Sequence, residues 1–227
     1  MKKISALLLC AALFACCSKY GPKDPVDYVN PYIGNISHLL VPTFPTVQLP
    51  NSMLRVYPER ADYTSEYVNG LPVIVTNHRE RSAFKLGVTT EDELRPVIPV
   101  TYDNEHLTPY GFSVDLQDGA VHADYAVSHQ SAVYRIRFRE GRGTLLLTSL
   151  NGAVSLADGV FAGYQVVDGE TKVYVYMEVQ EKPVQEGILR HGQLTDGKSD
   201  SGRNACVGMV FDAPEVHLRY GVSFISQ

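Results

Sequence analysis

Apolar and polar residues alternate strictly along several segments in the second half of the chain. This period-two pattern is typical of a β-strand that buries one face in a core and exposes the other. It predicts strands over residues 112–116, 121–128, 134–139, 173–179 and 216–224. Residues 144–150 are apolar more continuously, which is typical of a central strand covered on both faces.

Dipeptides that favour tight turns separate these segments. They stand at residues 118–119, 151–152, 158–159, 168–169 and 196–197, and each pairs Asp or Asn with Gly. Because glycine readily takes the positive φ that two-residue hairpins need, we expect neighbouring strands to be antiparallel. After the N-terminal segment no convincing 3.6-residue stripe appears, although residues 90–94 could form one helical turn. The sequence therefore predicts an all-β protein, an antiparallel β-sandwich rather than a closed barrel.

Two regions are expected to be irregular. Prolines at positions 42, 45, 50, 58 and 72 predict short or edge strands in the front part of the chain, because proline cannot donate to a strand ladder. Residues 185–204 are rich in Gly, Asp, Ser and Lys, and this composition predicts a long surface loop. No internal repeat or dividing linker is visible, so residues 28–227 are interpreted as one β-sandwich domain.

The first residues have the composition of a secretory signal. Lys2 and Lys3 precede an apolar run over residues 4–14, which is shorter than the roughly 20 residues of a membrane span. The run ends in Leu-Phe-Ala-Cys, which resembles a bacterial lipobox with Cys16 as the lipidated residue. The alternative is an ordinary signal with cysteines by chance. We predict a lipoprotein signal peptide over residues 1–15 and a flexible tether over 16–27. The protein would then be lipid-anchored in the bacterial cell envelope, on the periplasmic face or the cell surface.

Charge and cysteine usage exclude several classes of protein. The 227 residues carry 20 Lys and Arg against 25 Asp and Glu, a formal net charge of −5, so no basic surface for nucleic acid is expected. Cys10 lies in the predicted signal and Cys16 would be acylated, which leaves Cys17 and Cys206 and implies no disulfide framework. No Cys-x-x-Cys or His-x-x-x-His spacing predicts a metal site.

Candidate catalytic residues are sparse. The sequence has no Gly-x-Ser-x-Gly motif and no glycine-rich phosphate loop. Four acidic residues that could supply a catalytic carboxylate pair are interpreted as ordinary surface acids: Glu66, Glu80, Asp103 and Glu105. His122 and His217 alternate out of predicted strands and are expected to face solvent. The sequence also lacks tryptophan, an aromatic platform that sugar sites commonly use.

Four segments, taken in order, are similar to the segments of one known protein family. Residues 27–34 read Asp-Tyr-Val-Asn-Pro-Tyr-Ile-Gly, which is similar to the opening signature of that family. Residues 108–135 resemble two of the family's strands and the run that follows them. Residues 172–183 resemble a strand with a Lys-Pro corner, and residues 216–226 resemble the strand that closes the family's N-terminal domain. The family that these four segments resemble is glycoside hydrolase family 92, the calcium-dependent α-mannosidases.

The resemblance implies a sandwich of the galactose-mutarotase-like supersandwich type, packed against a following (α/α)6 catalytic domain. It places the catalytic carboxylates and most calcium ligands in that second domain, which is missing here. No catalytic residue, metal or cofactor is therefore expected on this chain, and calcium is expected only in the catalytic domain. The expected function is a carbohydrate-associated accessory domain of an exported α-mannosidase-like glycosidase, non-catalytic by itself. Its expected partners are a glycan or the (α/α)6 domain, and the membrane through the lipid anchor. The alternative is a stand-alone glycan-binding or structural surface lipoprotein.

The same resemblance indicates four positions as possible sugar or domain-interface contacts. His38 and Phe44 match a segment of the family's sugar pocket, although the glycines of that segment are missing here. His78 follows the apolar residues 73–75, and together with Arg81 it could donate several hydrogen bonds to hydroxyl groups. The alternative for His78 and Arg81 is a solvated loop, in which residues 79–81 alternate in the sign of their charge.

Overall fold

The computed structural model describes residues 24–35, 39, 43–60, 65–76 and 82–226. The chain divides into two compact units, Met1–Asn30 and Pro31–Gln227. In the first unit, the 3-10 helix η1 (Pro25–Tyr28) begins after Asp24, whose backbone N–H donates to the Asp27 carboxylate at 3.1 Å. Among the described residues, no helix has the length and apolarity needed to cross a membrane.

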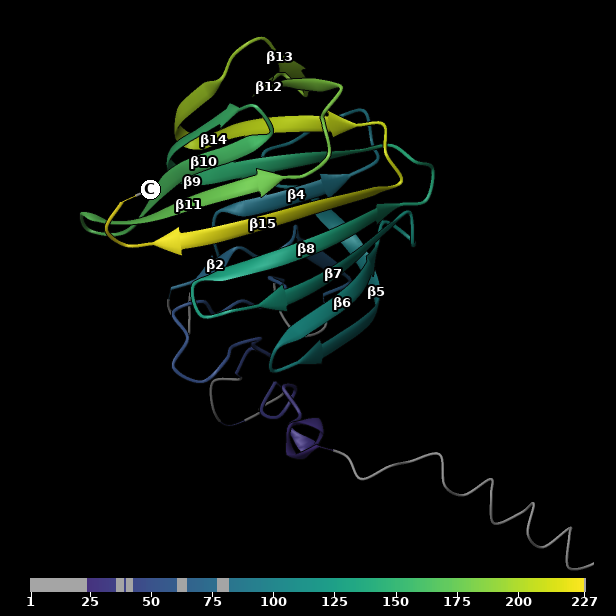
Figure 1. The fold of residues 1–227 in the computed structure, drawn as a ribbon, viewed down its shortest axis with the longest axis vertical. Helices are drawn as coiled ribbons and strands as arrows, with labels where there is room; N and C mark the ends of the chain where they lie inside the picture. The colour runs from purple at the N-terminus through teal and green to yellow at the C-terminus, as the bar shows by residue number, and fades with distance from the viewer. Residues whose placement is uncertain (1–23, 36–38, 40–42, 61–64, 77–81, 227) are drawn as a thin grey trace, which may run out of the picture. The chain divides into compact units, whose positions relative to one another are not determined.

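The second unit is built of antiparallel strands. They are β1 (Tyr67–Asn69), β2 (Ile74–Val75), β3 (Ser82–Ala83), β4 (Lys85–Thr89), β5 (Pro99–Thr108), β6 (Gly111–Leu116), β7 (Val121–Val127), β8 (Ser131–Phe138), β9 (Gly143–Ala157), β10 (Val160–Asp168), β11 (Thr171–Val179), β12 (Gln185–Arg190), β13 (Gln193–Thr195), β14 (Ser199–Phe211) and β15 (Glu215–Ser223). Most of them join one large sheet, in the order β1-β5-β6-β7-β8-β15-β11-β10-β9-β14-β12-β13 (Figure 1). Strand β4 pairs with β9, and β2 and β3 form a small separate sheet.

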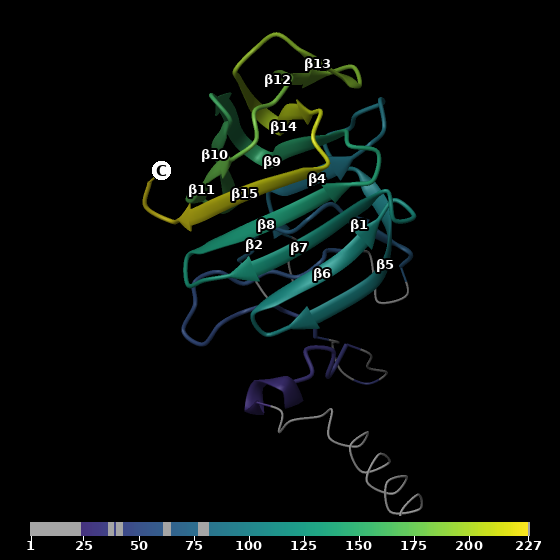
Figure 2. The same cartoon turned by 45° about the vertical axis from the view of Figure 1, so that its right-hand side comes forward.

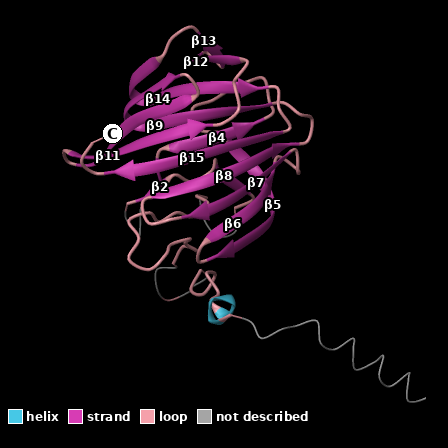
Figure 3. Ribbon diagram, viewed as in Figure 1, coloured by secondary structure: helices cyan, strands magenta, loops and turns pink. Residues whose placement is uncertain are grey.

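The large sheet is open, because β1 and β13 stand at the two ends of its order. It twists and curves around a core instead of closing into a barrel (Figure 2). Strands and loops make up the described part of this unit in the view coloured by secondary structure (Figure 3). The predicted fold class, an all-β antiparallel sandwich, is therefore confirmed.

Strand β8 shows how the alternating sequence produces this arrangement. Tyr134, Ile136 and Phe138 are at most 2% exposed, whereas Val133, which precedes them on the opposite face, is 50% exposed. Strands β6, β7, β11 and β15 follow the same alternation, so each presents one apolar face to the core and one face to solvent. The strand segments predicted from period-two alternation are confirmed, with shifts of a few residues at their ends.

Buried tyrosines attach the irregular front part of the chain to the core face of the sheet. The hydroxyl of Tyr134 donates to the carbonyl oxygen of Pro72 at 2.7 Å, and that of Tyr220 donates to the carbonyl oxygen of Val73 at 2.8 Å. The hydroxyls of Tyr125 and Tyr220 lie 3.2 Å apart. Burial raises the pKa of Tyr134 and of Tyr220 well above the ordinary value, so both remain neutral donors. These bonds satisfy backbone carbonyls that have no strand partner.

The front part is irregular, as the prolines predict. The described residues 43–60 and 65–66 contain no strand, only an isolated bridge between Val47 and Val56, and the following strands β1 to β3 are two or three residues long. A buried ion pair between Glu59 and Lys85 fixes this part to β4. Glu59 also accepts a hydrogen bond from the backbone N–H of Ser82 at 2.6 Å, so the buried carboxylate has a charged and a neutral donor.

The predicted turn at Asn151-Gly152 is wrong, because β9 runs straight through it. At this point β9 changes neighbour on one side, from β4, which pairs as far as Thr148, to β10, which pairs from Gly152 onward. A Cβ on Gly152 would lie 2.0 Å from the carbonyl oxygen of Tyr164. The glycine is required here for close backbone approach within a sheet and not for a hairpin.

The predicted surface loop over residues 185–204 is also wrong, since it forms β12, β13 and the first half of β14. These strands are polar because they lie at the sheet's edge, where backbone pairing does not demand apolar alternation. The turn between β12 and β13 uses His191 and Gly192, both with positive φ. The helical turn that residues 90–94 could have formed is absent, because the Leu94 backbone N–H instead donates to the carbonyl oxygen of Gly192.

Candidate functional site

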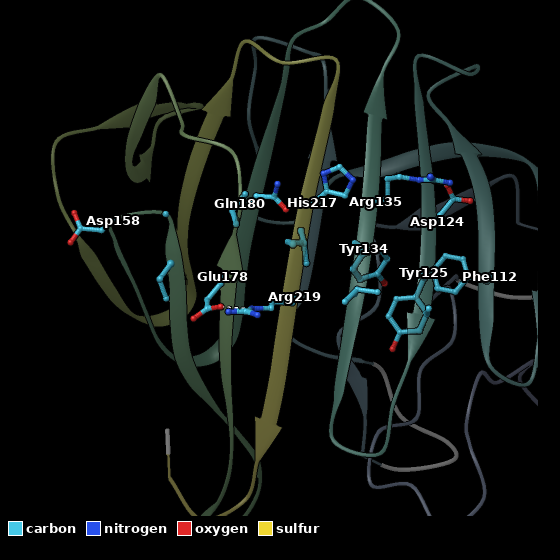
Figure 4. Close-up of a pocket in the computed structure, with 16 residues that line it drawn as sticks. Phe112, Asp124, Tyr125, Tyr134, Arg135, Asp158, Glu178, Gln180, His217 and Arg219 are labelled. Carbon is cyan, nitrogen blue, oxygen red and sulfur yellow. Dashed lines mark hydrogen bonds and ion pairs between the residues drawn. The ribbon is translucent and has the colours of Figure 1, made fainter.

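A groove crosses the solvent-facing side of the large sheet, over strands β7, β8, β15 and β11 (Figure 4). Its volume is about 890 Å³, within the range of ligand pockets. Side chains two residues apart on one strand share a face, so alternate residues of these four strands point to the side of the sheet where the groove lies. Residues 158–160, at the turn between β9 and β10, also line it. The side chains that project into it include Asp124, Ala126, Val133, Arg135, Glu178, Gln180, His217 and Arg219.

The strand register places four polar side chains in one row across the sheet. Asp124 on β7 is the cross-strand partner of Arg135 on β8, and Arg135 is the partner of His217 on β15. Gln180 continues the row, because its backbone N–H donates to the carbonyl oxygen of His217 at 2.9 Å. Figure 4 shows these side chains side by side along one side of the groove.

A second row, two residues further along the strands, combines apolar and charged side chains. Ala126 pairs with Val133, Val133 with Arg219, and Arg219 with Glu178. Arg219 donates through Nε to the Glu178 carboxylate. Ala126 and Val133 are short, while the arginines and glutamate around them are long, and this difference in length creates the hollow.

Asp124 is the most connected residue of the groove. Its Oδ2 accepts hydrogen bonds from Arg135 Nη2 at 2.8 Å and from Arg137 Nη2 at 3.0 Å, and its Oδ1 lies 3.2 Å from His122 Nε2. His122 Nδ1 in turn lies 2.5 Å from Asp115 Oδ1. Partial burial acts to raise the pKa of Asp124, but hydrogen bonds from Arg135 and His122 outweigh it, and the pKa lies below its ordinary value.

A second histidine, His217 on β15, also lies between two carboxylates. His217 Nδ1 lies 2.9 Å from Glu181 Oε1, and its Nε2 lies 3.1 Å from Glu215 Oε1. The backbone N–H of His217 also donates to Glu181 at 2.6 Å. The prediction that His122 and His217 point out of the core is confirmed, but each lies between two carboxylates and not free in solvent.

These contacts limit the chemistry that the groove can perform. A general acid needs a carboxyl group whose pKa is raised, whereas the pKa of Asp124 is lowered, and Glu178 is ion-paired with Arg219. Within the described ranges, no group of three or more histidine, cysteine and acidic side chains is placed to hold a metal ion. The arrangement therefore suits recognition by hydrogen bonds better than proton transfer.

A second polar cluster lies on β5, where Glu105 departs from the surface position predicted for it. The Glu105 carboxylate is ion-paired with Arg60, and the two side chains are 9% and 8% exposed. Arg60 also donates to the Tyr102 hydroxyl at 2.7 Å. The pairing of β5 with β6 shifts register between Asp103 and His106, and this irregularity places Glu105 toward Arg60. The prediction that Glu66 and Asp103 are exposed is confirmed.

Of the positions predicted as sugar or domain-interface contacts, Phe44 is the one that the structure describes. Its ring stacks on the ring of Tyr57 with centroids 4.3 Å apart and planes 10° apart, and Tyr57 is 2% exposed. One face of Phe44 is thus packed on the core, and the side chain is half-buried. His38, His78 and Arg81 lie outside the described residues, as do the lipidation candidate Cys16 and the acid Glu80, and these assignments remain predictions.

The groove residues themselves were not predicted as a site. Alternation already places Arg135 and Arg137 on the face opposite Tyr134, and His217 and Arg219 on the face opposite Leu218. The alternation does not predict the strand order β7-β8-β15-β11. This order brings residues that are far apart in the sequence side by side. Charged residues recur on the polar faces of β7, β8 and β15, and this pattern could have indicated a site.

The fold and this groove define an antiparallel β-sandwich domain with a polar groove on one side of its large sheet. The family model for the glycosyl hydrolase family 92 N-terminal domain matches residues 28–223. Because this match spans most of the chain, the protein belongs to that family, and the resemblance seen in the sequence is confirmed. A comparison with curated proteins gave no match.

Solved structures with the same fold include family GH92 enzymes. An inverting mannosidase from Bacteroides thetaiotaomicron superposes with a TM-score of 0.76 at 20% identity, over 90% of this chain and 32% of the enzyme. An α-mannosidase from the same organism gives a TM-score of 0.75 at 18% identity, over 91% of this chain and 34% of the enzyme. A glycosyl hydrolase of the same family, CcMan5, gives 0.70 at 19% identity. This chain therefore spans about a third of the length of these structures.

Proposed function

We propose that this chain serves as the carbohydrate-associated accessory domain of an exported α-mannosidase-like glycosidase, and that it packs against an (α/α)6 catalytic domain. The observation that carries the proposal is the match of residues 28–223 to the N-terminal domain of a glycosidase family. The structural similarity to about a third of two family GH92 mannosidases supports it.

The groove supports a non-catalytic role for the chain by itself. Two of its three carboxylates are held in ion pairs, Asp124 with two arginines and Glu178 with one, while the third, Asp158, lies in the turn between β9 and β10. Hydrolysis of a glycosidic bond needs one carboxyl group that can donate a proton and a second that acts as base or nucleophile. The catalytic carboxylates and the calcium ion would be supplied by the (α/α)6 domain.

Export and membrane attachment complete the proposal. Diacylglycerol transfer to the thiol of Cys16 would anchor the domain to the bacterial envelope, on the periplasmic face or the cell surface. Metabolic labelling with an alkyne fatty acid tests this part, because the label should appear on the wild-type chain and disappear from Cys16→Ser.

The catalytic assignment is tested by assaying the purified chain with 4-nitrophenyl α-mannoside. We expect no turnover by the chain alone, with or without added calcium. A second arm mixes the chain with a separately produced (α/α)6 domain of a family GH92 mannosidase and looks for a complex by size-exclusion chromatography. Turnover by the chain alone would overturn the non-catalytic role. Sequencing the DNA downstream is a separate test, because an in-frame coding sequence for a helical domain would support the association with an (α/α)6 domain.

A further inference from the structure

The groove over β7, β8, β15 and β11 carries charged side chains of both signs, and arginines neutralise two of its three carboxylates. The third, Asp158, lies in the turn between β9 and β10. Asp124 is bonded to Arg135, and Glu178 is bonded to Arg219. A ligand with a strong net charge would have to break these pairs or meet a like charge beside each opposite one. The groove therefore favours a neutral ligand.

The same side chains keep hydrogen-bonding groups toward the groove. The side chains of Arg135 and Arg219 are 49% and 76% exposed, and those of Asp124 and Glu178 are 31% and 37% exposed. Each guanidinium has five N–H donors, and each carboxylate accepts several hydrogen bonds. A hydroxyl group donates and accepts at once, so one hydroxyl can bond both members of an arginine–carboxylate pair. Two such pairs, one in each row, match a ligand with several hydroxyl groups.

The second row also contributes apolar surface. Val133 is 50% exposed on the floor, and Ala126 beside it is also exposed. Tyr176 is 47% exposed and lines an adjoining hollow of about 420 Å³, which shares Val133 and Arg219 with the groove. An aromatic ring and short aliphatic side chains suit the C–H faces of a sugar ring.

The dimensions indicate more than one sugar ring. Adjacent strands are about 4.8 Å apart, so the rows from β7 to β11 extend over roughly 14 Å. The volume of about 890 Å³ is large for a single ring. We propose that this groove is a binding site for a neutral oligosaccharide, with Tyr176 contacting one ring and the two arginine–carboxylate pairs bonding hydroxyl groups. The proposal rests on the carbohydrate role given above and adds the site and the ligand class.

The experiment titrates the whole chain with three probes: an α-linked mannotriose, maltotriose and a sulfated trisaccharide, followed by calorimetry and by amide NMR shifts. Val133→Lys puts a long charged side chain on the groove floor, and Tyr176→Ala removes the ring. The matched control is Val184→Lys, because Val184 is 58% exposed and does not line the groove. Circular dichroism melting checks that all three variants fold.

We expect a neutral trisaccharide to bind and to shift amides of β8 and β15. Val133→Lys and Tyr176→Ala should each weaken binding by about tenfold or more, while Val184→Lys should change it by less than about twofold. Failure of all neutral probes to bind, tighter binding of the sulfated probe, or equal affinity of Val133→Lys would each overturn the proposal.

A further arm separates this proposal from the accessory-domain function. If Val133→Lys abolishes the complex with the (α/α)6 domain, the groove is a domain interface, and the oligosaccharide proposal is overturned while the accessory role stands. If the chain alone hydrolyses the aryl mannoside, the accessory role fails, and the trisaccharide titrations still decide the groove independently.

Discussion

The hydroxyl of Tyr134 donates a 2.7 Å hydrogen bond to the carbonyl oxygen of Pro72, sixty-two positions earlier in the chain. The ring of Tyr134 is 1% exposed and packs at the centre of the core face. The bond joins a regular strand to a segment that has few strand partners of its own. The front part of the domain is therefore held to the sheet by side-chain hydrogen bonds of this kind as well as by backbone hydrogen bonds.

Replacing Tyr134 by Phe should destabilise the fold. The change removes one hydroxyl and leaves the Pro72 carbonyl oxygen buried without its donor, at a cost of about 1–3 kcal/mol in the free energy of unfolding. Urea unfolding followed by circular dichroism measures this difference. Tyr176→Phe is the matched control, because Tyr176 is 47% exposed, and it should change stability by less than about 0.5 kcal/mol. Equal effects of the two changes would contradict the role of the Tyr134 bond.

Gly143 should tolerate no side chain. A Cβ there would lie 2.0 Å from Cε1 of Phe138, a ring that is 2% exposed, so Gly143→Ala must displace a packed core residue. We expect a loss of about 1–3 kcal/mol or more in the free energy of unfolding, with an unchanged m-value. Gly221→Ala provides the comparison, since its Cβ would meet only Gln130 O at 3.8 Å, and it should be near neutral. A stable Gly143→Ala variant would show that the Phe138 ring can move.

The sequence predicts the strands well wherever one face of a strand is buried and the other is exposed to solvent. The alternation in β6, β7, β8, β11 and β15 depends only on which face meets the core, and the structure confirms it. It fails where strands are stabilised by backbone pairing at an edge, as in β12 and β13, whose residues read as a polar loop. The turn prediction also fails at Gly152, because the sequence does not distinguish a glycine that allows close backbone approach from one that forms a turn.

The site is less predictable than the fold because it depends on strand order. Asp124 and Arg135 come from consecutive strands, and their pairing could follow from a hairpin. The pairing of Arg135 with His217 requires β15 to lie beside β8, a long-range contact that no local pattern specifies. Glu105 shows a further limit, since an irregular register in β5 turns an apparent surface acid into the buried partner of Arg60.

The buried ion pair of Lys85 and Glu59 should be sensitive to loss of one partner. Lys85→Met leaves the Glu59 carboxylate buried without its cation, which should cost about 3–5 kcal/mol in the free energy of unfolding. The double variant Lys85→Met/Glu59→Gln should recover much of the loss, because no buried charge remains. Arg95→Met is the exposed control, since the ion pair of Arg95 with Glu93 is 66% and 75% exposed, and its effect should stay below about 1 kcal/mol. A double variant no better than Lys85→Met would contradict this electrostatic explanation.

Acid should weaken the fold through the carboxylates around His122. Hydrogen bonds from Asn104 and His122 lower the pKa of Asp115, and the pKa of Asp124 is lowered as well. A carboxyl group with a lowered folded-state pKa stabilises the fold above its ordinary pKa, here 3.8, and that stabilisation is lost as the pH falls through the folded-state value. Urea midpoints measured from about pH 6 to about pH 3 should fall, and the fall should be shallower in Asp124→Asn. The exposed Asp196→Asn should retain the wild-type slope, and an unchanged slope in Asp124→Asn would rule out this origin.

Cys206 should be unreactive while the protein is folded. The side chain is 1% exposed, and burial raises the pKa of its thiol to about 11. Since the thiolate is the nucleophile, its fraction at pH 8 is about a thousandth, which is about a hundredfold below that of an unperturbed cysteine. Iodoacetamide labelling of the Cys206 peptide, followed by mass spectrometry, should therefore be at least about a hundredfold slower in buffer than in concentrated urea. Similar rates in the two conditions would mean that β14 opens readily, because only exposure of the strand could give the reagent access to this sulfur.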